Sequence, residues 1–201
     1  MNNFLDNYLI EIKKLNFNNP ELELRVLLNN CLFNLKNEIF LKNFDLSKIN
    51  VKKFKSAFNR RIKHEPLSKI FNKKEFWGLE FYVDKYVLDP RPESEFLIQT
   101  IKEYFKNYKS NIKICDLGTG SGCLAITLAK IYNKSKITAI DISDVAVEIA
   151  KKNAKKHKVE KKINFINCDW AFINQHYDLV VSNPPYLANK QYEDCEFNIK
   201  N

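Results

Sequence analysis

The sequence is short of glycine, with only four in 201 residues. Long apolar runs are also missing, and without about 18 consecutive apolar residues the sequence predicts no membrane span. The N-terminal stretch MNNFLDNYLIEIKKL carries acidic residues inside its apolar pattern and no small-residue cleavage site, which is not the pattern of a signal peptide. We therefore expect a cytoplasmic protein.

Metal-binding and disulfide patterns are absent as well. The cysteines are Cys31, Cys115, Cys123, Cys168 and Cys195. They form no C-x-x-C pair, and their odd number favours reduced thiols. The histidines are His64, His157 and His176. Because these three lie far apart in the sequence, we expect neither a metal site nor a histidine-based catalytic triad.

Positive charge is in excess, with a formal net charge of +9. Residues 1–64 hold 12 Lys and Arg against 6 Asp and Glu, and the segment KKFKSAFNRRIK holds six of these cations. Such a surplus suits an acidic or nucleic-acid partner. However, Phe54, Phe58 and Ile62 form an apolar stripe in this segment. We therefore interpret it as an amphipathic bundle helix, and direct nucleic-acid binding is not expected.

The apolar pattern predicts three parts. Residues 1–64 have the three- and four-residue spacing of helices and predict a small helical domain. Residues 65–91 are rich in aromatic and β-branched residues with one glycine, which predicts a β-hairpin linker. Residues 92–201 alternate helices and strands, which predicts an α/β domain with a parallel sheet.

Four strands are expected in the third part: IKICDL, KITAID, INFIN and YDLVVS. The helices CLAITLAKIY and VAVEIAKKNAKKH follow the first two of them. Sheets of this kind bind ligands at the carboxyl ends of their strands, near the point where the strand order reverses. Residues that directly follow these four strands are therefore the candidates for a binding site.

Three of the four glycines lie together in DLGTGSG, residues 116–122. Glycine at a strand-to-helix turn permits a positive φ and a close approach of the backbone to a ligand. A dinucleotide site would place its third glycine at position 123, where Cys123 stands. The spacing therefore argues against NAD and favours a ligand without a pyrophosphate, such as S-adenosylmethionine. The predicted loop contacts are Gly118, Thr119, Gly120, Ser121 and Gly122.

Acidic residues follow the second and third strands. Asp141 ends the second strand, about twenty residues beyond the glycines, and can accept both ribose hydroxyls. Helix capping is the competing role for Asp141, but Ser143 is better placed for it. Asp169 can accept from an adenine amino group, and Trp170 can cover the adenine ring. A buried core position is an equally good interpretation of Trp170.

The fourth strand is followed by NPPY, residues 183–186. The Asn183 side-chain oxygen and the Pro184 carbonyl can accept hydrogen bonds from the NH₂ of an amide or aromatic amine, and so direct its nitrogen toward a methyl group. Pro184 and Pro185 would keep these acceptors rigid, which is catalysis by positioning. Tyr186 can pack on a flat substrate and favours nearby cationic charge. These four residues are the predicted catalytic group, and Asn183 is also a predicted cofactor contact.

DLGTGSG, Asp141, DW and NPPY together resemble the S-adenosylmethionine-dependent amino methyltransferases. The segment EPLSKIFNKKEFWGLEFYVDKYVLDPRPESE is similar to the linker of release-factor glutamine methyltransferases, with Ser94 where that family usually has Thr. The resemblance implies a Rossmann-like class I methyltransferase sheet and S-adenosylmethionine as cofactor. It also implies methylation of the side-chain amide of the glutamine in the Gly-Gly-Gln motif of peptide-chain release factors. Residues 1–64 would then help to dock the release factor, and residues 65–91 would link the two domains.

The C-terminal end departs from this family. The family's catalytic domain has seven strands, whereas four are expected here, and the acidic FEP segment that usually follows NPPY is absent. In the family's topology YDLVVS would pair with a fifth strand on one side. We therefore expect residues 1–201 to expose this edge and to be less active than a chain with a complete sheet.

Two alternative functions stay open. NPPY is shared with adenine-N methyltransferases that act on DNA or RNA, but these need a basic groove and a target-recognition element, which residues 183–201 do not indicate. A catalytically impaired remnant that only binds partner or cofactor is the other alternative, and composition does not separate it from an active enzyme. We expect a monomer.

Overall fold

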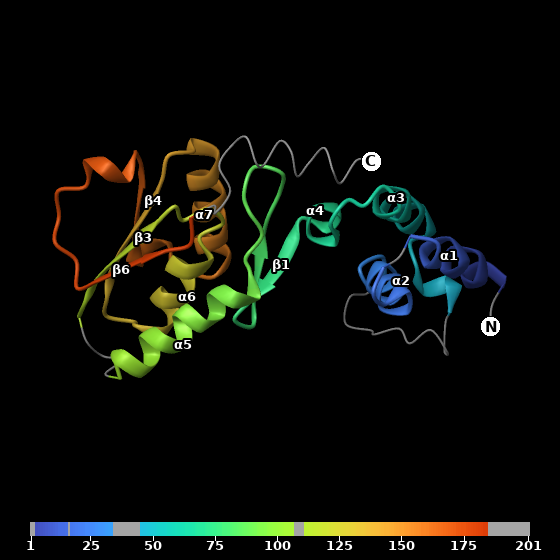
Figure 1. Ribbon diagram of the computed structural model, residues 1–201, viewed down its shortest axis with the longest axis horizontal. Coiled ribbons are helices and arrows are strands. Elements are labelled where there is room, and N and C mark those ends of the chain that lie inside the picture. The colour runs from blue at the N-terminus through green and yellow to red at the C-terminus, as the bar shows by residue number, and fades with distance from the viewer. Residues whose placement is uncertain (1–2, 16, 34–44, 107–110, 185–201) are drawn as a thin grey trace. The chain divides into compact units, whose positions relative to one another are not determined.

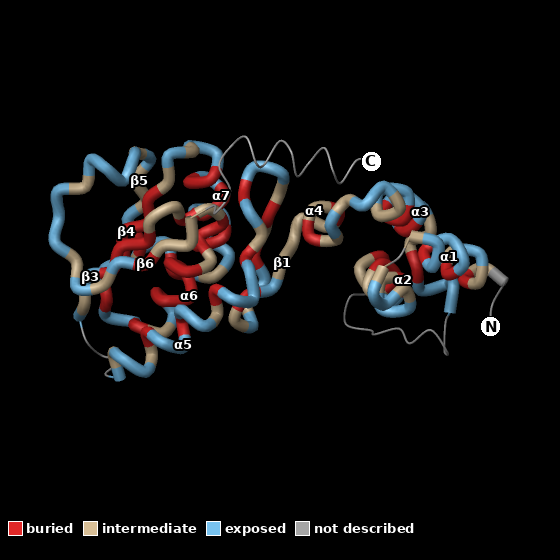
Figure 2. The backbone as a smooth tube through the Cα atoms, in the orientation of Figure 1, coloured by how far each residue is buried: buried red, intermediate tan, exposed pale blue. Residues whose placement is uncertain are grey.

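The computed structural model of the chain describes residues 3–15, 17–33, 45–106 and 111–184 (Figure 1). It separates into two compact units, Met1–Phe71 and Asn72–Asn201. Each unit has an apolar core of its own, and Figure 2 shows the buried segments of each. No helix in the described ranges is both long enough and apolar enough to cross a membrane.

The first unit is helical, as its sequence predicts. Its elements are α1 (Asn3–Lys13), α2 (Pro20–Asn29), η2 (Leu46–Lys48), α3 (Val51–Arg61) and α4 (Leu67–Phe71). Asn19 caps α2, because its side chain accepts a hydrogen bond of 3.0 Å from the backbone nitrogen of Leu22. Phe54 and Phe58 of α3 are buried, while the lysines of this helix are exposed. The basic segment is therefore an amphipathic helix.

The second unit contains the hairpin and the parallel sheet. Its strands are β1 (Lys73–Phe76), β2 (Leu79–Tyr82), β3 (Lys113–Leu117), β4 (Lys136–Asp141), β5 (Ile163–Asn167) and β6 (Leu179–Ser182). Its helices are η3 (Pro92–Ser94), α5 (Glu95–Tyr104), α6 (Cys123–Ile131), α7 (Asp144–Lys156), η4 (Glu160–Lys162) and η5 (Trp170–Phe172).

The hairpin turns at Trp77 and Gly78, which both have a positive φ, of 53° and 67°. Two consecutive residues in this region match the right-handed twist of the two strands that they join. The turn is anchored from outside the hairpin, since the Trp77 backbone nitrogen donates to Glu95 Oε1 at 2.7 Å. The unit boundary falls between Phe71 and Asn72, within the predicted linker. The division into residues 1–64, 65–91 and 92–201 stays a prediction.

The sheet has the order β5-β4-β3-β6, and all its neighbouring strands are parallel. The chain moves outward from β3 through β4 to β5 and then returns to the other side of β3 with β6. This is one half of a doubly wound sheet, with the reversal of strand order between β3 and β6. Helices α5, α6 and α7 lie on one side of the sheet (Figure 1). The predicted Rossmann-like α/β class with four strands is confirmed.

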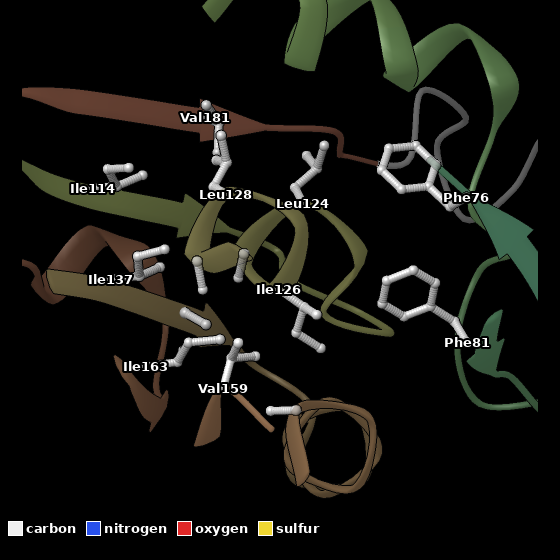
Figure 3. Packing of buried hydrophobic residues seen from close by; sticks show 14 of the residues in the cluster. Phe76, Phe81, Ile114, Leu124, Ile126, Leu128, Ile137, Val159, Ile163 and Val181 are labelled. Carbon is white, nitrogen blue, oxygen red and sulfur yellow. The ribbon is translucent and has the colours of Figure 1, made fainter. Parts of the chain in front are cut away.

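Helix α6 is the centre of the core of this unit. Figure 3 shows Val181 of β6 beside Leu128 of α6, and Phe76 and Phe81 of the hairpin on the side of the same helix that carries Leu124 and Ile126. Six of the nine residues of α6 are buried, so its surface is apolar on nearly every side. A helix buried in this way holds its first turn, and the loop before it, in a fixed position above the sheet.

Candidate functional site

A cavity of about 540 Å³ lies at the carboxyl ends of the four parallel strands. Its walls come from the segments directly after β3, β4, β5 and β6, and from residues 86–91. This volume lies within the roughly 300–1,000 Å³ that is typical of small-molecule sites. The cavity includes the point where the strand order reverses, which is where sheets of this type bind ligands.

The glycine loop crosses the floor of this cavity between β3 and α6. Gly118 and Gly120 line it with φ values of +69° and +53°, and a Cβ on Gly120 would meet no atom closer than 4.0 Å. Gly122 does not line the cavity. A Cβ there would come within 3.0 Å of Ile126 and 3.1 Å of Ala150, so this glycine permits close packing of α6 against α7. Two of the three glycines therefore expose backbone to a ligand.

Asp116, in β3, is a buried acid in the cavity wall with 1% of its surface exposed. Its Oδ2 accepts hydrogen bonds from Thr119 Oγ1 at 2.7 Å and from the Ala125 backbone nitrogen at 3.2 Å. Its buried Oδ1 has no hydrogen-bond partner within the described residues. A buried acceptor without a partner is costly, and a cationic or hydrogen-bonding ligand in the cavity would relieve that cost.

Burial also raises the pKa of Asp116, against the hydrogen bonds from Thr119 and Ala125, which lower it. The neighbouring carboxylate of Asp141 adds a smaller rise, and the net pKa is about 6. The ionised form is therefore held at a cost that a positive charge nearby would reduce.

Asp141 lies at the end of β4 and lines the same cavity. Its Oδ2 accepts from the Gly120 backbone nitrogen at 2.8 Å, and its Oδ1 accepts from that of Ser143 at 3.0 Å. Ser143 caps α7, because its hydroxyl accepts from the Ala146 backbone nitrogen at 3.2 Å. The expectation that Ser143 takes the capping role is therefore confirmed. The carboxylate of Asp141 is held at the tip of the glycine loop.

Asp169 and Trp170 form the wall after β5. Asp169 directly precedes η5 and caps it, because its Oδ1 accepts from the Ala171 backbone nitrogen at 2.9 Å. Trp170 is 48% exposed and lines the cavity, so the interpretation of this tryptophan as a core residue is wrong. A Cβ on Gly118 would lie 3.4 Å from the Trp170 ring, which shows how closely the glycine loop passes the indole. The Trp170 indole is therefore part of the cavity wall beside the loop.

Asn183 follows β6 and reaches the cavity together with Pro184. The hydroxyl of Ser182 donates to the Leu117 carbonyl at 2.9 Å, which ties the ends of β6 and β3 together. Asn183 Nδ2 donates to Ser94 Oγ at 2.7 Å. The other two members of the predicted catalytic group, Pro185 and Tyr186, lie outside the described residues.

Comparison with known proteins identifies the family. Residues 88–197 match the family described as Methyltransferase small domain. The chain is 37% identical to the release factor glutamine methyltransferase of Dictyoglomus turgidum, over 94% of this chain and 68% of that protein. It is 35% identical to that of Buchnera aphidicola subsp. Baizongia pistaciae, over 96% of this chain and 70% of that protein.

The chain belongs to the release factor glutamine methyltransferase family. It is also 37% identical to the bifunctional methyltransferase of Rickettsia bellii, over 92% of its own length, but it spans only 38% of that longer protein. The predicted family and the predicted enzyme class are thus confirmed at the level of the methyltransferase domain.

The sequence did not point to three residues that line the cavity or bond to residues that line it. They are Asp116, Ser94 and Asn153. Asp116 begins the DLGTGSG motif, and a lone acid at the end of an apolar strand was a usable signal for it. Ser94 and Asn153 lie far in the sequence from the residues that they contact, and folding brings them together. Asn153 is fully buried in α7, and its amide bonds the Ser121 carbonyl at 2.9 Å and both backbone groups of Tyr82. No local pattern distinguishes this asparagine from a surface one.

Proposed function

We propose that this chain transfers a methyl group from S-adenosylmethionine to the side-chain amide nitrogen of the glutamine in the Gly-Gly-Gln motif of peptide-chain release factors. The proposal rests on one observation above all. Asn183, held at the end of β6, lies in the wall of a cavity that is also lined by the glycine loop and by the acids Asp116 and Asp141. Family membership supports the same activity. Residues 1–64 are proposed to contact the release factor.

The residues of the cavity fit this cofactor. S-adenosylmethionine carries a sulfonium and an ammonium group, a ribose and an adenine. Asp116 has an orphaned buried oxygen, and the open space beside Gly120 admits a ligand against the backbone. Asp141 would accept from the ribose hydroxyls, and Asp169 and Trp170 would hold the adenine. Thr119 would act indirectly, because its hydroxyl bonds Asp116, and Ser121 would line the site as part of the glycine loop.

When bound, S-adenosylmethionine supplies an electrophilic methyl group on a positively charged sulfur. An amide nitrogen is a poor nucleophile because its lone pair is delocalised, so the protein has to fix the geometry of the substrate amide. The Asn183 Oδ1 and the Pro184 carbonyl would each accept a hydrogen bond from the substrate NH₂. Two fixed acceptors orient the nitrogen toward the methyl group without a side-chain base. The N–C bond forms as the S–C bond breaks, and the nitrogen loses its extra proton after the transfer.

A direct assay tests this function. The chain is incubated with S-adenosylmethionine that carries a labelled methyl group, with a release factor as acceptor, and the modified peptide is located by mass spectrometry. We expect label on the glutamine of the Gly-Gly-Gln motif and none on a release factor in which that glutamine is replaced by glutamate. Label on DNA or RNA in parallel reactions, with none on the release factor, would refute the proposal.

Replacement Asp141→Ala is expected to weaken the binding of S-adenosylmethionine. A charge-assisted hydrogen bond to the ribose contributes roughly 1.5–3 kcal/mol, so the dissociation constant should rise by about 10- to 100-fold in calorimetry. Asp144→Ala is the matched control, because Asp144 is an exposed acid in the first turn of α7. Unchanged affinity in Asp141→Ala would place the nucleoside elsewhere.

The binding of S-adenosylmethionine should depend on pH through Asp116. The pKa of this acid is raised to about 6 by burial, and a cation binds its ionised form. Below pH 6 most Asp116 is protonated and must lose its proton before the ligand binds. The affinity for S-adenosylmethionine should therefore be about tenfold lower at pH 5 than at pH 7. Asp116→Asn should bind weakly at both pH values, with the pH dependence lost, whereas Asp144→Asn should retain it. An equal pH dependence in Asp116→Asn would contradict this role.

A further inference from the structure

We infer that Ser94 is a positioning residue for Asn183, because its hydroxyl fixes the orientation in which the Asn183 amide meets the substrate. This inference rests on the proposed function and adds to it a residue that acts through Asn183 and not on the substrate. The contact joins two residues that are 89 positions apart in the chain, at 2.7 Å from Asn183 Nδ2 to Ser94 Oγ.

Ser94 is mounted on a rigid part of the second unit. Its side chain is buried, with 5% of the residue exposed, and its backbone nitrogen donates to the Arg91 carbonyl at 3.0 Å. It ends η3 and directly precedes α5, whose Ile98 and Ile101 are buried in the apolar core. The hydroxyl is therefore fixed relative to the sheet that carries Asn183.

The position of Ser94 suggests helix capping, but the structure uses the hydroxyl differently. Ser94 stands at the residue before α5, where a serine side chain commonly accepts from a backbone nitrogen of the first turn. Here the side chain makes no such capping bond. The buried hydroxyl instead accepts from Asn183. A serine whose role was to stabilise α5 would instead accept from a backbone nitrogen of the first turn of that helix.

The two ends of an asparagine amide have opposite hydrogen-bonding properties, which makes its orientation decisive. With Nδ2 donating to Ser94, Oδ1 lies at the other end of the planar group. The substrate amide presents NH₂ donors, so it needs an acceptor from Asn183. If the Asn183 amide turned over, its donor would meet the donor of the substrate. In the structure Ser94 bonds the donor end of the Asn183 amide, and Oδ1, the acceptor that the substrate needs, is the end turned away from Ser94.

The backbone of Asn183 is fixed from the other direction. The Ser182 hydroxyl bonds the Leu117 carbonyl, and Ser182 pairs with Leu117 in the sheet. These contacts hold the backbone at the strand end and do not involve the side chain of Asn183. The hydrogen bond to Ser94 acts on the side-chain amide itself. Loss of the Ser94 hydroxyl should therefore affect the rate of transfer and leave cofactor binding unchanged.

The kinetic test uses three variants of the full chain with a release factor as acceptor. Ser94→Ala removes the hydroxyl, Ser94→Thr keeps it, and Ser135→Ala removes a different buried hydroxyl, 4% exposed and outside the cavity lining. We expect Ser94→Ala to lower kcat roughly tenfold, the effect of one net hydrogen bond, with an unchanged dissociation constant for S-adenosylmethionine. Ser94→Thr should restore kcat, and Ser135→Ala should leave it unchanged.

A double-mutant cycle separates positioning from a structural role. In an Asn183→Ala background, Ser94→Ala should cause no further loss of rate, because its partner is already gone. A further tenfold loss in that background would overturn the inference. So would equal kcat values for Ser94→Ala and the parent chain.

A measurement without turnover keeps the inference testable by itself. The side-chain NH₂ signals of Asn183, assigned by their loss in Asn183→Ala, should shift in Ser94→Ala and exchange with water about tenfold faster. They should stay in place in Ser135→Ala. If the parent chain methylates no release factor, the proposed function is wrong. If the Asn183 signals do not respond to Ser94→Ala, the positioning role is wrong, whatever the activity.

Discussion

Replacement of Asn183 by alanine should lower the rate of methyl transfer by about 10²–10³, which is the usual cost of removing one oriented hydrogen-bonding group from an active site. The side chain lies in the cavity wall after β6 and is held there by Ser94. Alanine removes the acceptor that would orient the substrate amide and leaves the glycine loop and its acids in place. Affinity for S-adenosylmethionine should therefore change by no more than about threefold.

Single-turnover transfer of a labelled methyl group measures the rate in this variant, and calorimetry measures cofactor affinity. Asn133→Ala is the matched control, because Asn133 is exposed and follows α6, whose opposite end begins at the glycine loop. Near-normal transfer by Asn183→Ala would show that another group orients the substrate. A parallel loss of cofactor affinity and rate would show that Asn183 serves the cofactor instead.

Replacement of Asn153 by alanine should destabilise the second unit by about 3 kcal/mol. The amide oxygen of Asn153 accepts from the Tyr82 backbone nitrogen at 2.7 Å. Its amide nitrogen donates to the carbonyls of Tyr82 and Ser121, each at 2.9 Å. Asn153 therefore bonds the outward-facing backbone N–H and C=O of Tyr82 in β2, as a residue of a neighbouring strand would. It also connects β2 to the glycine loop through Ser121. Alanine leaves three backbone groups without these partners, at one buried and two partly buried hydrogen bonds.

Urea unfolding followed by tryptophan fluorescence measures the stability of the second unit. The only two tryptophans, Trp77 and Trp170, both belong to the second unit. Asn133→Ala again serves as the control, since it removes the same amide from an exposed position. We expect the unfolding midpoint to fall in Asn153→Ala alone. Equal midpoints in the two variants would mean that the backbone groups of Tyr82 and Ser121 find other partners at little cost.

Two arginines of α3 make contacts within the first unit. Part of the charge on α3 is used within the first unit, where Arg61 pairs with Glu23 at 2.7 Å and lies 4.0 Å from the centre of the Phe17 ring. Arg60 pairs with Glu65. The apolar stripe of the helix faces the core of the bundle. That the segment does not bind nucleic acid directly stays a prediction.

Much of the fold was determined by local sequence. Strand β4 runs from Lys136 to Asp141, as the apolar run KITAID predicts, and β5 coincides with INFIN. These signals can be seen in one dimension because the side-chain period of a strand or helix is set by its own backbone geometry. The same holds for the ends of the parallel strands. Glycines, acids or an asparagine that directly follow such strands must meet at one edge of the sheet, so Gly118, Asp141 and Asn183 could be predicted together.

Only the tertiary structure decided which other residues serve the site. The bond from Asn183 to Ser94 spans 89 positions, and that from Asn153 to Tyr82 spans 71, so no periodicity links the partners. Trp170 could be core or cavity wall by its sequence, since an aromatic residue suits both, and burial depends on which elements pack around it. The raised pKa of Asp116 likewise exists only because the folded chain removes water from that carboxyl group.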